Sequence, residues 1–421
     1  MAISTLHLTN AYHEHSGGIR TMYHALLEHA EQHGRRMTLV VPAAADRDER
    51  RGRFTRIVHV RAPRSPVADG RYRMLLPHRF IRVGRGRLWQ LLEDERPDVV
   101  EVCDKYSLCF FAGLIRRRWR GRRPALVGLS CERMDDNVEA FVRTGPAARA
   151  FAREVIGRVY MGMFDVHLAN SAYTAEELRR AMRAPHLRPV HVCPPGVDVP
   201  AAPPPSDIAT GRRELLARCG RPDATILLYS GRLSPEKRVS ILPGIMAQLA
   251  ARTPPVHLVV AGDGPLRTRL EAESAALAPG RVHLLGHLRR DALWRLMHAC
   301  DGFVHPNPRE PFGIGPLEAM AAGTPVIAPA SGGIRTYASQ ENAWLSTADA
   351  AAMASTIAAC LDAPDERQRR IIAGRRTAAA HTWTVAAARM VARYEAACMA
   401  VNDRAVATER RAPIDRNLQR I

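Results

Sequence analysis

Short apolar runs alternate along the chain with stretches whose apolar residues recur at helical spacing. The first two runs are residues 6–8 and 37–41. Between them, the apolar residues from Ile19 to Ala30 fall on one helical face, and Gly34 closes the predicted helix. This alternation is typical of repeated βαβ units. It therefore predicts an α/β protein built from doubly wound parallel sheets.

A proline-rich segment separates the predicted strands into two series. The first series continues at residues 99–102, 125–129, 166–169 and 190–192, and the second covers residues 225–229, 256–261, 282–285, 302–305 and 326–328. Between them lie Pro194, Pro195 and three further prolines at 203–205, which cannot continue a helix or an inner strand. We expect two Rossmann-like domains, residues 1–200 and 201–385. A C-terminal helix and tail, residues 386–421, should pack back on the N-terminal domain.

Length and composition agree with two folded domains, because 421 residues exceed one ordinary core. The start of the chain lacks a basic segment followed by an apolar run of signal-peptide length, and no run approaches 18 apolar residues. The eight cysteines are scattered, without a CxxC pair or a neighbouring histidine cluster. This spacing argues against a disulfide framework and against a structural zinc, so the expected location is the reducing cytoplasm.

The net charge of +19 is concentrated in one part of the chain. Residues 51–123 hold 19 Lys and Arg against 7 Asp and Glu, and the densest stretch is residues 116–123 (RRRWRGRR). Such a surface fits anionic lipid, nucleic acid, an acidic substrate, or simply a solvated face rich in arginine. Nucleic-acid binding also needs aromatic residues for stacking, and only Tyr72, Trp89 and Trp119 are near. No nucleic-acid partner is expected, whereas an anionic membrane surface remains an open possibility.

Two glycine-containing loops follow predicted strands, where ligands bind in such sheets. Gly17 and Gly18 stand before the first helix, where paired glycines allow close backbone approach and helix amides favour a phosphate. A tight turn would also need glycine there. In the second half, residues 230–238 (SGRLSPEKR) place Arg232 and Lys237 at a strand end, and two such cations suit a diphosphate. An exposed basic loop is the alternative.

A longer motif, residues 310–326 (EPFGIGPLEAMAAGTPV), predicts a loop followed by a short helix. Pro316 fits the first helical position and Gly323 the end of the helix, which places Glu318 in the first turn. Glu310 then lies in the preceding loop, and backbone amides from residue 312 to 315 lie between the two carboxylates. Carboxylates and amides together suit a sugar and a ribose, although Glu318 could equally stabilise the helix dipole.

Taken in order, these motifs resemble those of the retaining glycosyltransferases of family 4, the mannosyltransferase-like group 1 enzymes with the GT-B fold. The resemblance extends over nearly the whole chain. It rests on the glycine pair, the segment 195–198 (PGVD), the residue 231–237 loop, the residue 262–264 turn (GDG), and Glu310 and Glu318 with seven residues between them. It implies two Rossmann-like domains that face each other across a cleft, and a retaining transfer of a hexose.

The resemblance also implies roles for particular residues. Arg232 and Lys237 would neutralise the donor diphosphate, and Glu310 would contact the donor sugar. The amides of Phe312, Gly313 and Ile314 would assist Glu310, Glu318 would bind the ribose, and Gly17 with Gly18 would close over the diphosphate. Neither a metal nor another cofactor is implied. The donor would be GDP-mannose or a UDP-hexose, and the acceptor a lipid-linked glycan or a saccharide of the cell envelope, reached from the cytoplasmic face of the membrane.

The chain departs from the family pattern in two loops. Many relatives carry a histidine after the strand at 125–129, where this chain has Cys131 and Glu132, which become candidates for acceptor contacts. The Gly332-Gly333 pair lacks the Pro-Glu pair that usually follows it, so side-chain contacts there cannot be transferred. The alternative functions are a GT-B-like nucleotide-sugar epimerase and a non-catalytic nucleic-acid-binding protein.

Overall fold

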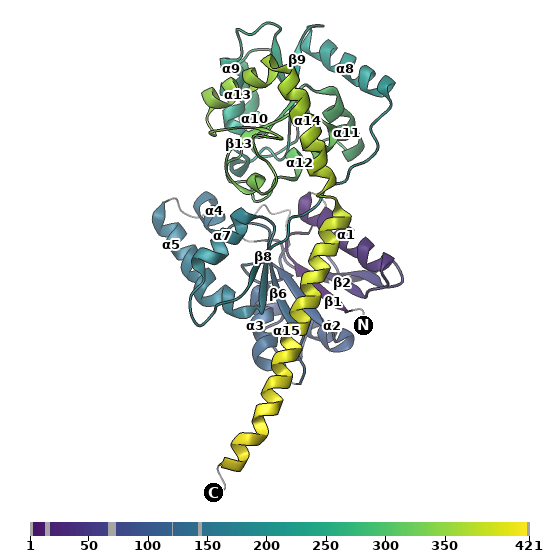
Figure 1. Cartoon of the computed structure of the whole chain (residues 1–421), viewed down its shortest axis with the longest axis vertical. Helices are drawn as coiled ribbons and strands as arrows, with labels where there is room; N and C mark the ends of the chain where they lie inside the picture. The colour runs from purple at the N-terminus through teal and green to yellow at the C-terminus, as the bar shows by residue number, and fades with distance from the viewer. Residues whose placement is uncertain (1–2, 13–16, 66–72, 120, 142–144, 419–421) are drawn as a thin grey trace. The chain divides into compact units, whose positions relative to one another are not determined.

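The computed structural model describes residues 3–12, 17–65, 73–119, 121–141 and 145–418, and it divides into two compact units. The first unit comprises Met1–Pro194 together with Trp383–Ile421, and the second comprises Pro195–Thr382. In Figure 1 the chain passes from purple and blue through the first unit to green in the second, and the yellow C-terminal helix belongs to the first unit again. The sequence predicted domains at residues 1–200 and 201–385, followed by a C-terminal segment at 386–421. These limits remain a prediction of which segments fold independently.

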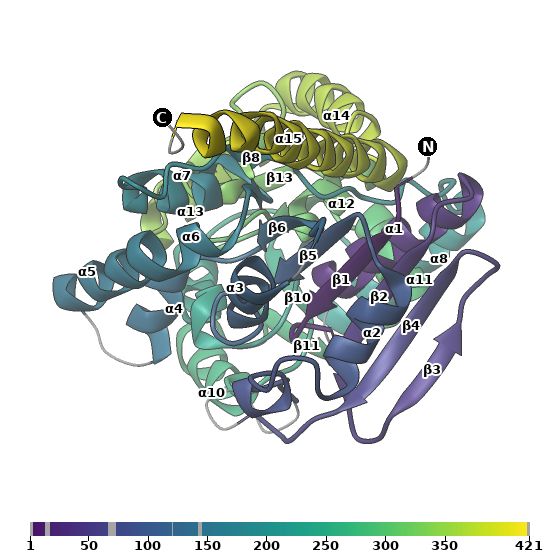
Figure 2. The same ribbon diagram turned by 90° about the horizontal axis from the view of Figure 1, so that it is seen from below.

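The first unit is built on an eight-stranded sheet with the order β3-β4-β2-β1-β5-β6-β7-β8. All neighbouring strands are parallel except β3, which runs antiparallel to β4 at one edge (Figure 2). The strands are β1 (Thr5–Thr9), β2 (Met37–Ala43), β3 (Arg47–Arg50), β4 (Thr55–Arg61), β5 (Val99–Cys103), β6 (Ala125–Ser130), β7 (Val166–Ala169) and β8 (Val190–Val192).

Helices follow most of these strands, as parallel connections require. They are α1 (Gly18–Gln32), α2 (Arg87–Glu95), α3 (Cys109–Arg118), α4 (Met134–Phe141), α5 (Pro146–Val155), α6 (Met161–Met163), α7 (Ala172–Ala181) and α15 (Trp383–Leu418). The inner strands are buried on both faces: β5 and β6 are buried along their whole length. The core of this unit collects aromatic side chains such as Trp89, Phe111 and Phe164 beneath these helices.

The second unit contains a six-stranded, wholly parallel sheet with the order β11-β10-β9-β12-β13-β14. Its strands are β9 (Thr225–Ser230), β10 (Val256–Ala261), β11 (Val282–Gly286), β12 (Gly302–Val304), β13 (Val326–Pro329) and β14 (Trp344–Ser346). Its helices are α8 (Pro205–Cys219), α9 (Leu242–Gln248), α10 (Arg267–Leu277), α11 (Arg290–Ala299), α12 (Ile314–Ala322), α13 (Ala350–Asp362) and α14 (Pro364–Ala379).

Every strand predicted from the apolar pattern is present, and its ends differ from the prediction by at most two residues. Three strands were missed, namely β3, β4 and β14. The strand β3 has the sequence RDER, is largely exposed and lies at an edge, so no apolar alternation marks it. Among the helices that the structure describes, none combines the length and the apolar character needed to cross a bilayer.

The long helix α15 returns to the first unit after the chain has passed through the second. Its Tyr394 hydroxyl donates a hydrogen bond to the carboxylate of Glu101 on β5, and this carboxylate also accepts a 2.8 Å bond from Tyr23 on α1. The ring of His7 on β1 lies 3.1 Å from the same carboxylate. Helix α15 is therefore attached to the first unit by a buried polar network as well as by apolar packing.

Candidate active site

Two loops at the carboxyl ends of β9 and β10 pack backbone against backbone in the second unit. The Leu233 amide donates to the Asp263 carbonyl at 3.0 Å, and the Gly231 amide donates to the Ala261 carbonyl at 3.1 Å. A Cβ atom at Gly262 would lie only 1.9 Å from the Gly231 carbonyl oxygen, so this close approach requires glycine. The residue 262–264 turn thus positions the loop that carries the two predicted cations.

Within that loop, Lys237 ends a short 3₁₀ turn, Pro235–Lys237, and extends toward the neighbouring strand end. Its ammonium group lies 2.8 Å from both carboxylate oxygens of Glu310. The predicted partner cation, Arg232, is half-buried in the same loop, and the Tyr229 hydroxyl fixes its backbone by donating to its carbonyl at 3.0 Å. The structure thus brings together Lys237 and Glu310, which are far apart in the sequence.

Glu310 is buried and surrounded by donors. The Asn307 amide donates to its carboxylate at 2.9 Å, and His305 Nε2 lies 3.7 Å away. Burial alone would raise the pKa of Glu310, but the Lys237 ammonium and the other neighbours lower it to about 2. Burial lowers the pKa of His305 to about 4 despite the opposing charge of Glu310. At neutral pH the site therefore contains an ionised carboxylate, an ammonium group and a neutral imidazole.

The helix that follows Glu310 starts two residues earlier than the sequence predicted. It spans Ile314–Ala322, so Pro316 occupies its third position instead of its first, and Glu318 lies in the second turn instead of the first. Proline is tolerated there because first-turn amides have no acceptor within the helix. The predicted end is confirmed, since Gly323 follows in the left-handed conformation with φ +83°. The amides of Gly313 and Ile314 therefore lie at the N-terminus of α12, beside Glu310.

A second glycine-dependent backbone contact supports the loop that carries Glu310. The Gly333 amide donates to the Glu310 carbonyl at 2.6 Å, and a Cβ atom at Gly333 would lie 1.9 Å from the Pro311 carbonyl oxygen. The Tyr337 hydroxyl donates to the Gly313 carbonyl, and its ring packs on Phe312 with centroids 5.1 Å apart. In this chain Tyr337 and the backbone of Gly333 hold the loop in place.

Glu318 belongs to a different group of charges from Glu310. Its carboxylate lies 3.8 Å from the guanidinium of Arg290, and Arg290 in turn pairs with Asp198. All three line an open groove of about 1200 Å³, whose wall also includes Trp294. The Glu318 side chain is 23% exposed, and burial raises its pKa to about 7, with Arg290 opposing the shift. The carboxyl of Glu318 therefore titrates near neutral pH.

In the first unit, Gly17 directly precedes α1 and Gly18 is its first residue. A Cβ atom at Gly17 would meet no atom of the described residues within 4 Å, so contacts with that part of the chain do not require glycine at this position. The preceding Ser16 lies outside the described residues. Close approach of a ligand to the N-terminus of α1 is a physical reason for glycine here that remains compatible with the structure.

Cys131 and Glu132 follow β6 in the first unit. The backbone carbonyl of Glu132 accepts a bond from the Lys105 ammonium at 2.5 Å, and its carboxylate accepts one from Asn137 at 2.9 Å. Burial raises the pKa of Glu132. Cys131 is partly exposed, and its carbonyl accepts a 3.0 Å bond from Asn170. Both residues lie at the carboxyl end of a strand, and Glu132 is held in place by its neighbours.

The arginine cluster predicted as a basic surface is partly used inside the first unit. Arg116 and Arg123 both pair with the carboxylate of Asp165 at 2.7 Å, whereas Arg117 and Arg118 are exposed. Of the aromatic residues considered for base stacking, Trp89 is buried in the core and Tyr72 lies outside the described residues. The exposed positive charge of this cluster is therefore smaller than its sequence indicates.

Sequence reasoning missed several residues of the site, namely Asp198 as a charged partner, Arg290, His305, Asn307 and Tyr337. Arg290 begins α11 just beyond the carboxyl end of β11. Ligands of parallel sheets bind at the carboxyl ends of the strands, so residues at this position are candidates for a binding site. The sequence of His305 and Asn307 (HPNP) likewise follows β12 directly. These residues could have been predicted only from their position just after a strand, because they belong to no recognisable motif.

Comparisons with known proteins identify the family of the chain. The model of the family described as Glycosyltransferase Family 4 matches residues 16–200, and that of Glycosyl transferases group 1 matches residues 215–377. A GDP-mannose-dependent alpha-(1-6)-phosphatidylinositol dimannoside mannosyltransferase of Mycobacterium tuberculosis is 29% identical over 94% of this chain and 97% of its own length. A GDP-mannose-dependent alpha-mannosyltransferase of Mycolicibacterium smegmatis is 33% identical over 75% of this chain and 77% of its own length.

Solved structures show the same fold at low sequence identity. Sucrose-phosphate synthase from Thermosynechococcus elongatus superposes with a TM-score of 0.73 at 20% identity and covers 94% of this chain and 100% of its own. HepE from Anabaena, in complex with UDP-glucose, superposes with a TM-score of 0.67 at 20% identity and covers 94% of this chain and 99% of its own. The chain belongs to glycosyltransferase family 4, has the GT-B fold, and is a glycosyltransferase that uses a nucleotide sugar.

Proposed function

We propose that the protein transfers mannose from GDP-mannose to a lipid-linked acceptor, with retention of the anomeric configuration. The observation that carries this proposal is the Lys237–Glu310 pair beside the N-terminus of α12. A cation, a carboxylate and helix amides at one strand end match the diphosphate and the sugar hydroxyls of such a donor. The named relatives at 29% and 33% identity depend on GDP-mannose, which favours this donor over a UDP-hexose.

Each group in the site would have a distinct task. Lys237 and Arg232 would donate to the diphosphate and stabilise the charge that develops on the leaving nucleotide, a role that cations perform well in a site shielded from water. Glu310, then shared between Lys237 and the sugar, would accept hydrogen bonds from sugar hydroxyls. The amides of Gly313 and Ile314 would donate to the donor.

Glu318 would bind the ribose hydroxyls in the groove that it lines with Arg290 and Asp198. Its carboxylate is partly exposed to this groove, and it can accept two hydrogen bonds from neighbouring hydroxyls when ionised. Arg290 keeps the carboxylate oriented and partly ionised. This role is the one that the resemblance implies, and the groove beside Glu318 supports it.

The donor can be tested with the purified chain and a set of nucleotide sugars. Hydrolysis or transfer should be fastest with GDP-mannose and slower with GDP-glucose or UDP-glucose, and Lys237→Gln should lower each rate by about tenfold to a hundredfold. A preference for a UDP-hexose would reassign the donor. Conversion of the donor to an epimer without any acceptor would favour the epimerase instead.

A loop in the first unit supports a membrane-bound acceptor. In residues 77–87, Ile81 is 61% and Val83 is 44% exposed, and the exposed basic residues of this loop include Arg79, Arg82 and Arg85. Apolar side chains interleaved with cations suit a surface of anionic lipid, where each basic residue contributes about 1 kcal/mol. We propose that this loop, together with Arg117 and Arg118, brings the protein reversibly to the cytoplasmic face of the membrane.

Sedimentation with vesicles of increasing phosphatidylglycerol content tests this placement. Binding should rise with anionic lipid and fall with salt, and a variant with Ile81→Ser, Arg82→Gln and Arg85→Gln should lose most of it. The matched control is Arg47→Gln with Arg50→Gln, which removes charge from the edge strand β3. Binding that ignores both lipid charge and the loop substitutions would contradict membrane docking and favour a soluble acceptor, and it would leave the transferase assignment intact.

A further inference from the structure

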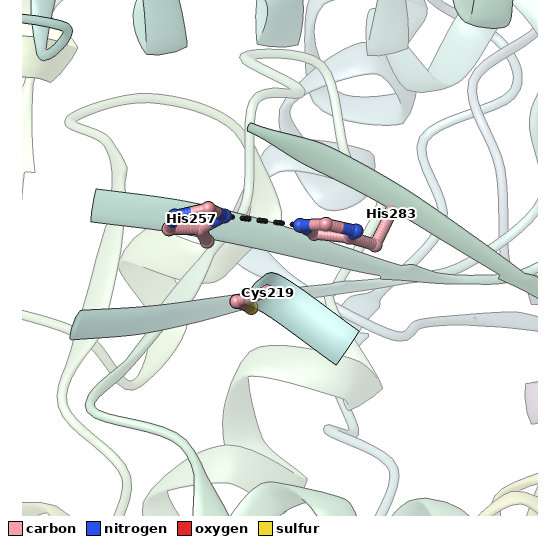
Figure 3. A group of neighbouring side chains, drawn as sticks. All are labelled: Cys219, His257 and His283. Carbon is pink, nitrogen blue, oxygen red and sulfur yellow. Dashed lines mark hydrogen bonds between the residues drawn. The ribbon is translucent and has the colours of Figure 1, made fainter. Parts of the chain in front are cut away.

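Three potential metal ligands meet at the amino ends of two strands in the second unit. His257 is the second residue of β10, His283 is the second residue of β11, and Cys219 is the last residue of α8 (Figure 3). Their ligand atoms all lie within 4.8 Å of one another. This edge of the sheet is opposite to the carboxyl ends that carry Lys237 and Glu310, so the cluster is separate from the active site.

The geometry of the cluster is close to that of a zinc site. Nδ1 of His257 and Nε2 of His283 face each other at 3.0 Å, and the two rings are inclined by only 19°. A tetrahedral zinc ion with Zn–N distances of about 2.0–2.1 Å and a Zn–S distance of about 2.3 Å needs ligand atoms about 3.3 to 3.6 Å apart. Side-chain movements of about 1 Å would therefore bring all three atoms into the coordination shell.

The cluster also has the burial expected of a site that a metal ion can enter. His257 is only 3% exposed, whereas Cys219 and His283 are partly exposed and leave a fourth position for water. Nε2 of His257 is buried without a hydrogen-bond partner among the described residues. Two of the nearby cations are bonded elsewhere, since Arg221 pairs with Asp223 and Arg281 donates to the carbonyls of Ala250 and Val256, whereas Arg218 is exposed.

We propose that Cys219, His257 and His283 form a binding site for zinc or a similar borderline metal ion. The thiolate of Cys219 and two neutral imidazoles are a ligand set that zinc accepts, with water as the fourth ligand. Binding releases the thiol proton of Cys219, and the proton of the His257–His283 hydrogen bond moves to the other ring nitrogen of the histidine that carried it, so both imidazoles stay neutral. The ion would connect the C-terminus of α8 to β10 and β11, and would therefore act as a structural staple.

Spacing explains why the sequence argued against such a site. The three ligands come from three separate elements. The sequence therefore has neither the CxxC motif nor the short histidine spacing that would predict a metal site. In the register of β10 and β11, His283 pairs with Val259, so His257 lies two residues away on the same face of the neighbouring strand. Only the sheet order brings them together.

The test measures metal binding by the purified full chain, independently of transfer activity. The chain is first freed of metal with a chelator, then incubated with micromolar Zn²⁺, and finally dialysed. It should retain one equivalent of Zn²⁺ after this dialysis. Co²⁺ should produce the near-ultraviolet band of a thiolate–cobalt bond. Cys219→Ser and the partly exposed His283→Gln should each weaken binding by more than about a hundredfold, because even outer-shell changes cost up to that factor.

Cys131→Ser is the matched control, because Cys131 is the other partly exposed cysteine while the remaining six are buried. It should retain both the zinc equivalent and the cobalt band. Two results would overturn the proposal: a wild-type chain that retains no zinc after dialysis, or zinc retention and a cobalt band that persist in Cys219→Ser. Circular dichroism of each variant distinguishes loss of the ligand from loss of the fold.

Discussion

Two glutamates of the candidate active site, with seven residues between them, have very different pKa values. Burial would raise the pKa of both, yet the Lys237 ammonium lowers that of Glu310 to about 2, while Glu318 reaches about 7 because Arg290 opposes burial only in part. One carboxylate is therefore a permanent anion, and the other is a group that protonates under physiological conditions. This difference follows from one neighbouring cation at 2.8 Å and another at 3.8 Å.

Replacing Lys237 should reduce transfer strongly. Lys237→Gln removes a charge-assisted contact worth about 1.5 to 3 kcal/mol, which corresponds to a loss of about tenfold to a hundredfold in kcat/KM. The control is Arg238→Gln, which neutralises the adjacent exposed cation of the same loop. Steady-state kinetics with GDP-mannose measure the difference. Equal losses in both variants would show that general surface charge, and not the Lys237–Glu310 pair, supports catalysis.

Glu318 should make nucleotide binding depend on pH. Because its pKa is raised from 4.5 to about 7, the carboxyl is protonated below that pH and cannot accept from both ribose hydroxyls. The affinity for GDP should therefore weaken as pH falls below about 7, by up to about tenfold per pH unit. Calorimetry between pH 5.5 and pH 8 measures this slope. Glu318→Gln should bind more weakly and with little pH dependence, and an unchanged slope in this variant would assign the titration to another group.

At the scale of elements, the site is held by loops that touch through their backbones. The residue 231–233 loop rests on the residue 262–264 turn, and the residue 310–313 loop rests on Gly333. Such contacts position the reactive side chains without using side chains themselves. They tolerate little change, because any added carbon atom displaces a main chain that cannot rotate away.

Substitution of Gly333 should therefore disturb the loop that carries Glu310. The Cβ atom of Gly333→Ala would lie 1.9 Å from the Pro311 carbonyl oxygen, and relieving such overpacking costs about 1 to 3 kcal/mol. We expect a lower melting temperature and weaker donor binding. Gly211→Ala in α8 is the control, since its nearest neighbour is 3.9 Å away and alanine favours a helix by up to about 1 kcal/mol. Equal stability of the two variants would contradict the tight contact.

The apolar pattern predicted the inner strands well because they are buried on both faces and read as continuous apolar runs. It failed for β3, where the edge position allows four charged residues, and for the start of α12, where Gly315 and Pro316 conceal a first turn. The motifs predicted Lys237, Glu310 and Glu318 as site residues, and the structure brings the first two into contact. Arg290 lies between Glu318 and Asp198 and pairs with both, and this arrangement depends on how strand ends are ordered in space, which no local pattern contains.

For the molecule as a whole, the return of α15 to the first unit is the most consequential connection. Tyr394 brings to the buried carboxylate of Glu101 one of the hydroxyl donors that it needs, and the other comes from Tyr23. Burial would raise the pKa of Glu101, but His7 and these hydroxyl donors lower it. The helix is thus part of the first unit's core rather than an addition to its surface.

Removal of the Tyr394 hydroxyl should loosen this attachment. Tyr394→Phe keeps the ring but deprives an ionised buried carboxylate of a donor, at a cost of about 1.5 to 3 kcal/mol. Amide hydrogen exchange along α15 should accelerate, and the first unit should melt several degrees lower. Glu395→Gln is the control, because it breaks a partly exposed pair with Arg35 that is worth about 0 to 1 kcal/mol. Unchanged exchange in Tyr394→Phe would show that apolar packing alone holds the helix.

Because the second unit interrupts the first, the two units are completed at different times on the ribosome. Pro195–Thr382 is one continuous segment that can fold once it has emerged, whereas Met1–Pro194 lacks α15 until the whole second unit has been synthesised. About 200 residues separate the two parts of the first unit, and translation at about 5 to 20 residues per second spends roughly 10 to 40 seconds on them. During this interval the nascent first unit exposes the surface that α15 later covers, and this is the period in which it would depend on a chaperone.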